Sequence, residues 1–124
     1  MDSNKHLDFS STSKYFLYTD YAQTTWNNYK YGVIRKSSSG IDVTISDYYE
    51  NSSTAGVTSS NGTNTYQMDG YSTAQKRNVA THEFGHALGL AHNLSGSVMY
   101  AYVSNVVTLS EHDKASYDYA YAYY

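Results

Sequence analysis

Three histidines and one glutamate stand close together in residues 82–92, which read His-Glu-Phe-Gly-His-Ala-Leu-Gly-Leu-Ala-His. His82 and His86 are four residues apart, so on a helix they lie one turn above each other and can both reach one metal ion. Glu83 flanks the same face, where a carboxylate can accept a proton from a metal-bound water without becoming a ligand. The spacing therefore predicts a metal site with a general base beside it.

His92 is the candidate for the third metal ligand. If the helix continued, His92 would lie about 9 Å beyond His86 along the axis, much farther than a Zn–N bond of about 2.0–2.1 Å. Gly89 stands between them and can adopt the positive φ that ends a helix and turns the chain back. Three imidazoles leave a fourth position for water or substrate, which is typical of a catalytic zinc site. The two remaining histidines, His6 and His112, are expected on the surface.

A methionine follows this motif, and Met99 stands seven residues after His92 in the segment 95–100, Ser-Gly-Ser-Val-Met-Tyr. The histidine motif with this downstream methionine resembles the metzincin clan of zinc peptidases, in which a Met-turn passes beneath the metal. Within that clan the chain is most similar to a minimal matrixin. Tyr100 directly follows the methionine, and residues 109–113, Leu-Ser-Glu-His-Asp, resemble the start of the matrixin C-terminal helix.

The resemblance implies a zinc-dependent metalloendopeptidase with one catalytic Zn²⁺ held by His82, His86 and His92. Glu83 would activate the zinc-bound water that attacks the peptide bond. The implied partner is a peptide or protein substrate that pairs in extended form with a sheet edge, expected near residues 55–58. The resemblance also implies a secreted, extracellular enzyme.

Several features leave the interpretation open. Ala101 stands where matrixins usually place proline, and Asn93 follows the third histidine where they usually have serine, so the subfamily is undetermined. Tyr100 and Tyr102 either line a specificity pocket or pack in the core. A different class of function is a non-catalytic module in which zinc only stabilises the fold. Glu83 argues against it, because a structural site needs no carboxylate beside two histidines.

The composition of the 124-residue chain excludes several classes of protein. The length is that of a single domain, residues 1–124. A formal net charge of −3 argues against nucleic acid as the main partner, and the absence of cysteine excludes disulfides, thiol catalysis and thiolate zinc sites. No apolar run is long enough to cross a bilayer, and because residues 1–6 lack the apolar core of a signal peptide, none is expected there. We expect a monomer that contacts neither nucleic acid nor membrane.

Periodicity in the first half of the chain predicts short strands around an early helix. Residues 15–18 form an aromatic and apolar run that is typical of a strand. Asp20 is the expected N-cap of a helix whose apolar face carries Trp26. Further short strands are expected at residues 33–34, 41–46, 55–58 and 65–69.

Two capping boxes predict the later helices. Ser72 with Gln75 opens the helix that carries the first two motif histidines, and Gly89 is its expected end. Ser110 with Asp113 opens a C-terminal helix. This order of elements predicts an α+β fold with a mixed sheet. The resemblance makes it a zincin-like, mostly parallel twisted sheet with an active-site helix and a C-terminal helix.

Overall fold

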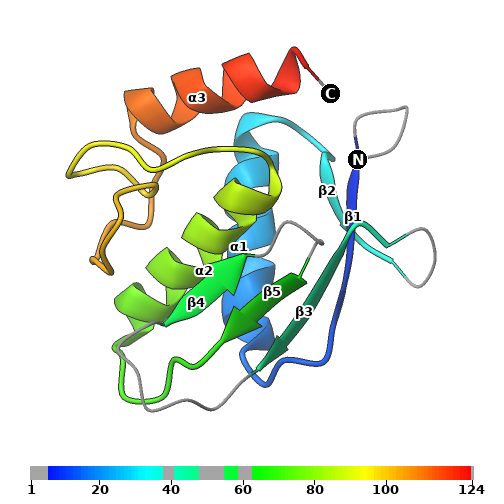
Figure 1. Ribbon diagram of the computed structural model, residues 1–124, viewed down its shortest axis with the longest axis vertical. Coiled ribbons are helices and arrows are strands. Elements are labelled where there is room, and N and C mark those ends of the chain that lie inside the picture. Colours follow the sequence, from blue (N-terminus) through cyan, green and yellow to red (C-terminus); the bar gives the residue numbers. More distant parts are fainter. Residues whose placement is uncertain (1–5, 38–40, 48–54, 59–62, 124) are drawn as a thin grey trace.

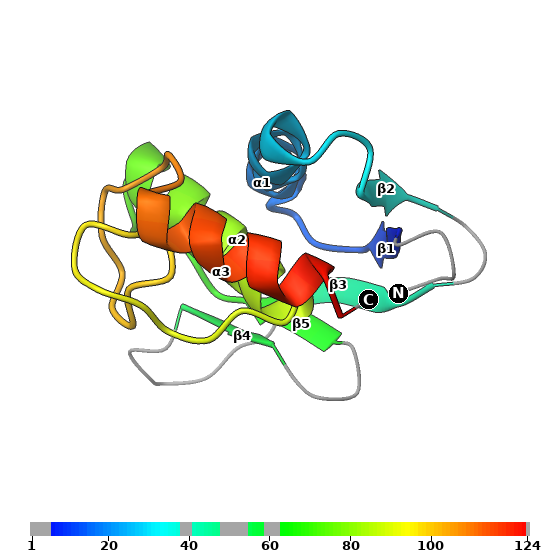
Figure 2. The same ribbon diagram turned by 90° about the horizontal axis from the view of Figure 1, so that it is seen from above.

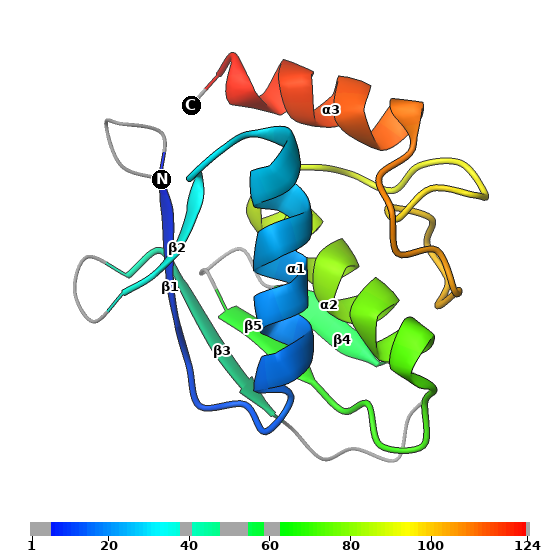
Figure 3. The same cartoon turned by 180° about the vertical axis from the view of Figure 1, so that it is seen from behind.

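The computed structural model describes residues 6–37, 41–47, 55–58 and 63–123 and has an α+β architecture (Figure 1). Its elements, in chain order, are β1 (Leu7–Ser11), α1 (Phe16–Tyr29), β2 (Ile34–Lys36), β3 (Val43–Asp47), β4 (Gly56–Thr58), β5 (Thr63–Tyr66), α2 (Thr73–Ala87) and α3 (Glu111–Tyr121). Helices α1 and α2 lie side by side against one face of the sheet, and α3 passes over their C-terminal ends (Figures 1 and 3). Seen from above, β3, β4 and β5 lie below the helices (Figure 2).

The sheet is mixed and mostly parallel, which confirms the expectation from the sequence. The strand order is β2-β1-β3-β5-β4, and β4 alone runs antiparallel to its neighbour. Val57 of β4 pairs with Thr65 of β5, so β4 forms one edge of the sheet beside α2. The strands expected at residues 33–34, 41–46, 55–58 and 65–69 correspond to β2, β3, β4 and β5 with shifted ends.

Helix α1 begins at Phe16, so the strand expected at residues 15–18 is wrong. Asp20 is not the N-cap either, because it lies inside the helix. Thr19 and Trp26 are buried two helical turns apart, as one helix face requires, whereas Phe16 in the first turn is 52% exposed. Aromatic residue type suggested a strand here, but the side chains are buried with a helical period.

Strand β1 has no counterpart among the expected elements, although it lies inside the sheet between β2 and β3. Leu7 and Phe9 are buried, as alternate residues of a strand often are, but Asp8 between them is buried too. The Oδ1 atom of Asp8 accepts a hydrogen bond from Arg35 Nε at 2.9 Å. An alternating pattern of three residues with a charged member is too short to identify a strand. His6 directly precedes β1 and is half-buried, so the prediction that it lies on the surface is only partly correct.

Both predicted capping boxes are present. Ser72 Oγ accepts from the Gln75 backbone N–H at 3.1 Å, and Gln75 Oε1 accepts from the Ser72 N–H at 3.0 Å. Ser110 and Asp113 exchange the equivalent bonds at 3.1 and 2.9 Å. Across the described ranges, no helix combines the length and the apolar character needed to cross a lipid bilayer.

Trp26 joins the three helices. Its side chain is fully buried, its Nε1 donates to the Thr81 carbonyl of α2 at 2.9 Å, and its ring meets Tyr117 of α3 edge to face at 5.3 Å. The other large, fully buried side chains are Phe9, Ile34, Ile45, Tyr66, Met68, Phe84, Leu88, Val98, Met99 and Tyr117. Because Thr81 immediately precedes the histidine motif, this packing fixes the part of α2 that carries the candidate site.

Candidate active site

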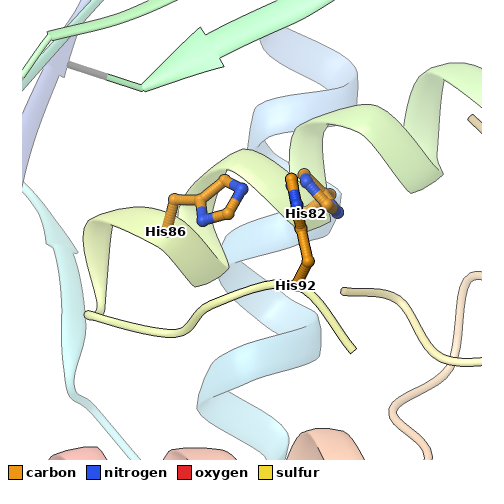
Figure 4. Close-up of side chains that lie close together, drawn as sticks. All are labelled: His82, His86 and His92. Carbon is orange, nitrogen blue, oxygen red and sulfur yellow. The ribbon is translucent and has the colours of Figure 1, made fainter. Parts of the chain in front are cut away.

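Helix α2 brings three of the four candidate residues to one place. His82 and Glu83 are buried, with 8% and 6% of their surfaces exposed, and His86 is half-buried one turn later. The sequence prediction that His82 and His86 share a helix face is confirmed, since their ring centroids lie 4.6 Å apart. The close-up in Figure 4 shows both rings projecting from α2 toward the same point.

The chain leaves the helix at Gly89, as predicted. Gly89 has a φ of 99°, its N–H donates to the His86 carbonyl, and the Leu90 N–H donates to the Gly85 carbonyl. This pair of bonds is a Schellman motif, which ends a helix by a left-handed residue that glycine adopts without strain. The turn brings the side chain of His92 back beside the helix. The centroid of its ring lies 5.3 Å from that of the His82 ring and 4.9 Å from that of the His86 ring (Figure 4).

The three imidazoles form a group that fits a divalent metal ion. One ring nitrogen from each histidine lies within 4.8 Å of the others. His82 Nδ1 donates to the Val98 carbonyl at 2.9 Å, and His86 Nδ1 donates to the Leu90 carbonyl at 2.8 Å. Because a carbonyl can only accept, the proton sits on Nδ1 of both rings and leaves each Nε2 lone pair available to a metal.

Burial favours the neutral form that a metal requires. The pKa of His82 is lowered to about 4, mainly by desolvation and also by the nearby His86 and His92, while the bond to the Val98 carbonyl and the charge of Asp113 act in the opposite direction. His82 is therefore neutral at pH 7 before any metal binds. A buried, neutral and oriented imidazole is a suitable donor for Zn²⁺.

Glu83 lies beside this group with its two oxygens in different surroundings. Oε1 accepts a hydrogen bond from Thr58 Oγ1 at 2.7 Å, and Oε2 lies 4.0 Å from His82 Nε2. Burial raises the pKa of the Glu83 carboxyl, while the bond from Thr58 and the nearby His86 and His92 act in the opposite direction. The carboxylate lies beside His82 but is not part of the group of three ring nitrogens that lie within 4.8 Å of one another.

A turn containing Met99 lies beneath the histidines, as the resemblance implied. Met99 is fully buried, and the Asn93 N–H donates to its carbonyl at 2.7 Å, which ties the segment after His92 to this turn. Asp113 accepts from the Val98 N–H at 2.8 Å and from the Met99 N–H at 3.1 Å. The sequence indicated only a capping role for Asp113, because nothing in its spacing shows a contact with a segment 14 residues earlier.

A cavity of about 250 Å³ opens beside His82 and Glu83. Residues 100–103 line one side of it, so Tyr100 and Tyr102 line a cavity and do not pack in the core. Asn78, buried on α2, binds the backbone just beyond these residues: its amide donates to the Val106 carbonyl at 2.7 Å, and its Oδ1 accepts from the Ser104 N–H at 3.1 Å. Nothing in the sequence pointed to Asn78 or Thr58 at the site, since Asn78 contacts a residue 28 positions away and Thr58 one 25 positions away.

The remaining histidines lie outside this group. His112 is exposed in the first turn of α3, as expected, and His6 stands before β1. In the part of the chain that the structure describes, only His82, His86 and His92 bring three metal-ligating side chains together. The candidate site therefore contains the histidines that the motif predicted.

Comparison with known families agrees with this geometry. No curated protein matches the chain at a significant level. The family model for matrixin, however, matches residues 5–122, nearly the whole sequence and all of the candidate site. Because the match extends so far beyond the histidine motif, the chain belongs to the matrixin family of peptidases, peptidase family M10.

Proposed function

We propose that residues 1–124 form one catalytic domain that hydrolyses internal peptide bonds as a zinc-dependent metalloendopeptidase. In this proposal His82, His86 and His92 hold a single Zn²⁺, and Glu83 is the general base. The main observation in its support is the convergence of three imidazoles beside a buried carboxylate, with the Nδ1 atoms of His82 and His86 bonded to carbonyls so that their Nε2 atoms are available. Membership of the matrixin family supports the same activity.

A Zn²⁺ ion bound by three imidazoles supplies Lewis-acid chemistry, because it lowers the pKa of a coordinated water and polarises the scissile carbonyl. Glu83 accepts the proton of the attacking water and then donates it to the leaving amine. Its Oε2 is suited to both transfers, since it is the oxygen nearer to the histidines.

The substrate is proposed to be an extended peptide that pairs with β4. This strand is the sheet edge beside α2, and its outer backbone groups suit addition of a further strand. One substrate side chain would enter the cavity between α2 and residues 100–103. Tyr100 and Tyr102 would then contact that side chain.

The proposal also includes that the protein is secreted and acts as a monomer. Matrixins are commonly secreted, and all four proposed site residues come from one chain, so no partner subunit is needed to complete the site. The net charge of −3 gives no reason to expect nucleic acid as a partner.

Replacement of Glu83 by Gln tests the proposal most directly. The change keeps the size and helix propensity of residue 83 but removes the group that accepts a proton. We expect hydrolysis of a quenched fluorescent peptide to fall by at least about 100-fold, the lower end of the usual effect of removing a general base. Zinc content should stay near one ion per chain, and the melting temperature should move by no more than about 3 °C, because Glu83 is not a proposed ligand.

His92→Ala is the matched control, because it removes a ligand and leaves Glu83 in place. Its zinc content should fall sharply, since the site needs all three imidazoles. If Glu83→Gln cleaves the peptide as fast as the unchanged protein, the assignment of the base is wrong. If the zinc-loaded, unchanged protein cleaves none of a broad set of peptides, the alternative of a structural zinc module gains support.

A further inference from the structure

Strand β4 presents two residues to the side chain of Glu83. Gly56 and Thr58 are two positions apart, so they lie on the same face of the strand. Thr58 Oγ1 lies 2.7 Å from Glu83 Oε1 and 3.0 Å from the Glu83 backbone carbonyl. A Cβ at Gly56 would lie only 3.0 Å from Glu83 Cγ and 3.0 Å from Val79 Cγ1, so glycine allows the strand to approach this closely.

We propose that Thr58 is a positioning residue for Glu83, with its hydroxyl holding Oε1 so that Oε2 faces the histidines. Gly56 assists by letting β4 approach the glutamate. The proposal rests on the proposed role of Glu83 as the general base. Thr58 acts through Glu83, whose carboxylate it contacts.

The terminal torsion of glutamate has a broad energy profile, so the carboxylate turns easily unless a partner fixes it. With Glu83 only 6% exposed, little water is available to replace a missing partner. The threonine hydroxyl has one proton, and the 2.7 Å separation favours its donation to the carboxylate over the carbonyl at 3.0 Å. Thr58 is therefore suited to select one orientation of the carboxylate.

The location of Thr58 links this orientation to substrate binding. Thr58 ends β4, the strand proposed to pair with the peptide. A peptide added to this edge would stabilise β4 and with it the hydroxyl that holds Glu83. Substrate binding and alignment of the base would thus depend on the same three-residue strand.

A purely structural role for Thr58 is the competing explanation, since its hydroxyl also lies near the backbone of α2. Thr58→Val keeps the shape and strand propensity of the side chain but removes the hydroxyl. If Thr58 positions the base, kcat should fall by about tenfold, while KM stays within about twofold. Zinc content should be unchanged, and Thr58→Ser should restore kcat to within about threefold of the unchanged protein.

Thr44→Val is the matched control. Thr44 is an exposed threonine in the same sheet, on β3, and it pairs with Ser10 and Thr63, away from α2. The same chemical change there should leave kcat and KM unaltered. An equal loss of kcat in Thr44→Val and Thr58→Val would overturn the positioning role.

The second measurement does not depend on activity. The chain contains three glutamates, Glu50, Glu83 and Glu111, so protein labelled with carboxyl-¹³C glutamate gives few resonances. Glu83→Gln identifies the Glu83 signal in the zinc-loaded protein. Thr58→Val should shift that signal and leave the others in place, and Thr58→Ser should return it toward its original position.

The outcomes separate the two proposals. Full activity and an unmoved Glu83 resonance in Thr58→Val, with Glu83→Gln inactive, would overturn the positioning role and leave the general base intact. A shifted resonance with unchanged kcat would also overturn it, since the bond would then not matter for turnover. Equal activity in Glu83→Gln and the unchanged protein would instead overturn the assignment of Glu83 as the general base, on which the positioning role rests.

Discussion

Two adjoining segments beside the histidines differ sharply in their surroundings. The floor segment, residues 97–100, passes beneath the histidines, and Ser97, Val98 and Met99 are almost completely buried. The wall segment, residues 101–107, begins at the next residue, yet Tyr102 is 72% exposed. The four residues of the floor segment and the seven of the wall segment are thus continuous in the chain, but the floor is mostly buried and the wall is exposed or half-buried.

Each segment is held by one buried polar side chain from a helix. Asp113 of α3 accepts the Val98 and Met99 N–H groups of the floor, and the Val98 carbonyl in turn accepts from His82. Asn78 of α2 holds Ser104 and Val106 of the wall, and neither bond involves a histidine. The orientation of the metal ligands and the shape of the substrate cavity therefore depend on different anchoring side chains. Asp113 is the anchor of the floor, and Asn78 is the anchor of the wall. This separation lets the cavity vary without disturbing the metal site.

Replacing the anchor of the floor should have the largest effect. In Asp113→Asn, the amide NH₂ would face a backbone N–H of residues 98 or 99 where a carboxylate oxygen now accepts. We expect the free energy of unfolding to fall by about 3 kcal/mol, since bonds to a buried charged group are lost. The affinity for zinc should fall by about tenfold or more, because His82 is oriented by the Val98 carbonyl. Chemical denaturation and competition with a chelator measure the two effects.

Glu111→Gln is the control for this change. Glu111 lies in the same turn of α3 and loses the same charge, but its side chain is 92% exposed and its ion pair with Lys114 is long, at 3.7 Å. Such a surface pair contributes little to stability. Zinc binding that weakens equally in both variants would show that net charge matters and that the floor does not orient His82.

The arrangement of the histidines was largely predictable from the sequence because their geometry is local, whereas the floor beneath them was implied by the resemblance to matrixins alone. Residues 82–92 lie on one helix and its terminating turn, so a fixed helical period and one glycine define their arrangement. The capping boxes likewise act over three residues, and both helix starts were correct. Local rules were sufficient wherever the partners lie within one turn of each other.

The roles of Asp113 and Asn78 as anchors, and that of Thr58 beside Glu83, were not predictable, because each side chain contacts residues that only the tertiary fold brings near it. Thr58 and Glu83 are 25 residues apart, and Asn78 and Val106 are 28 apart. The strand wrongly predicted at residues 15–18 has a similar cause, because a contact with a distant residue helps to place Tyr15. Its hydroxyl donates a hydrogen bond to Asp69 at 2.9 Å. A tyrosine held by a contact 54 residues away is indistinguishable, in sequence, from one in a strand.

Replacing the anchor of the wall should affect substrate choice more than metal binding. Asn78→Leu keeps the branched shape of the side chain, with the same number of heavy atoms, but leaves the Ser104 N–H and Val106 carbonyl without this partner. We expect the free energy of unfolding to fall by about 2 kcal/mol. The ratios of kcat/KM within a peptide panel should change by at least about threefold when only the residue entering the cavity is varied. Zinc affinity should be unchanged, and a parallel loss of zinc would show that wall and floor are not independent.

Met99→Leu should have the smallest effect, because it changes the packing of the floor without removing an anchor. Met99 is fully buried, and its sulfur packs so closely on Gly85 that a Cβ at that glycine would overlap it. Leucine has nearly the same volume but branches earlier, so we expect a loss of about 1 kcal/mol in the free energy of unfolding. The backbone bonds from Asp113 do not involve the Met99 side chain, so zinc affinity should be retained and kcat/KM should stay within about tenfold. Melting curves, chelator competition and peptide hydrolysis on one preparation measure all three quantities. Loss of zinc without loss of stability would mean that the sulfur itself influences the metal site, and the floor would then be more than a packed support.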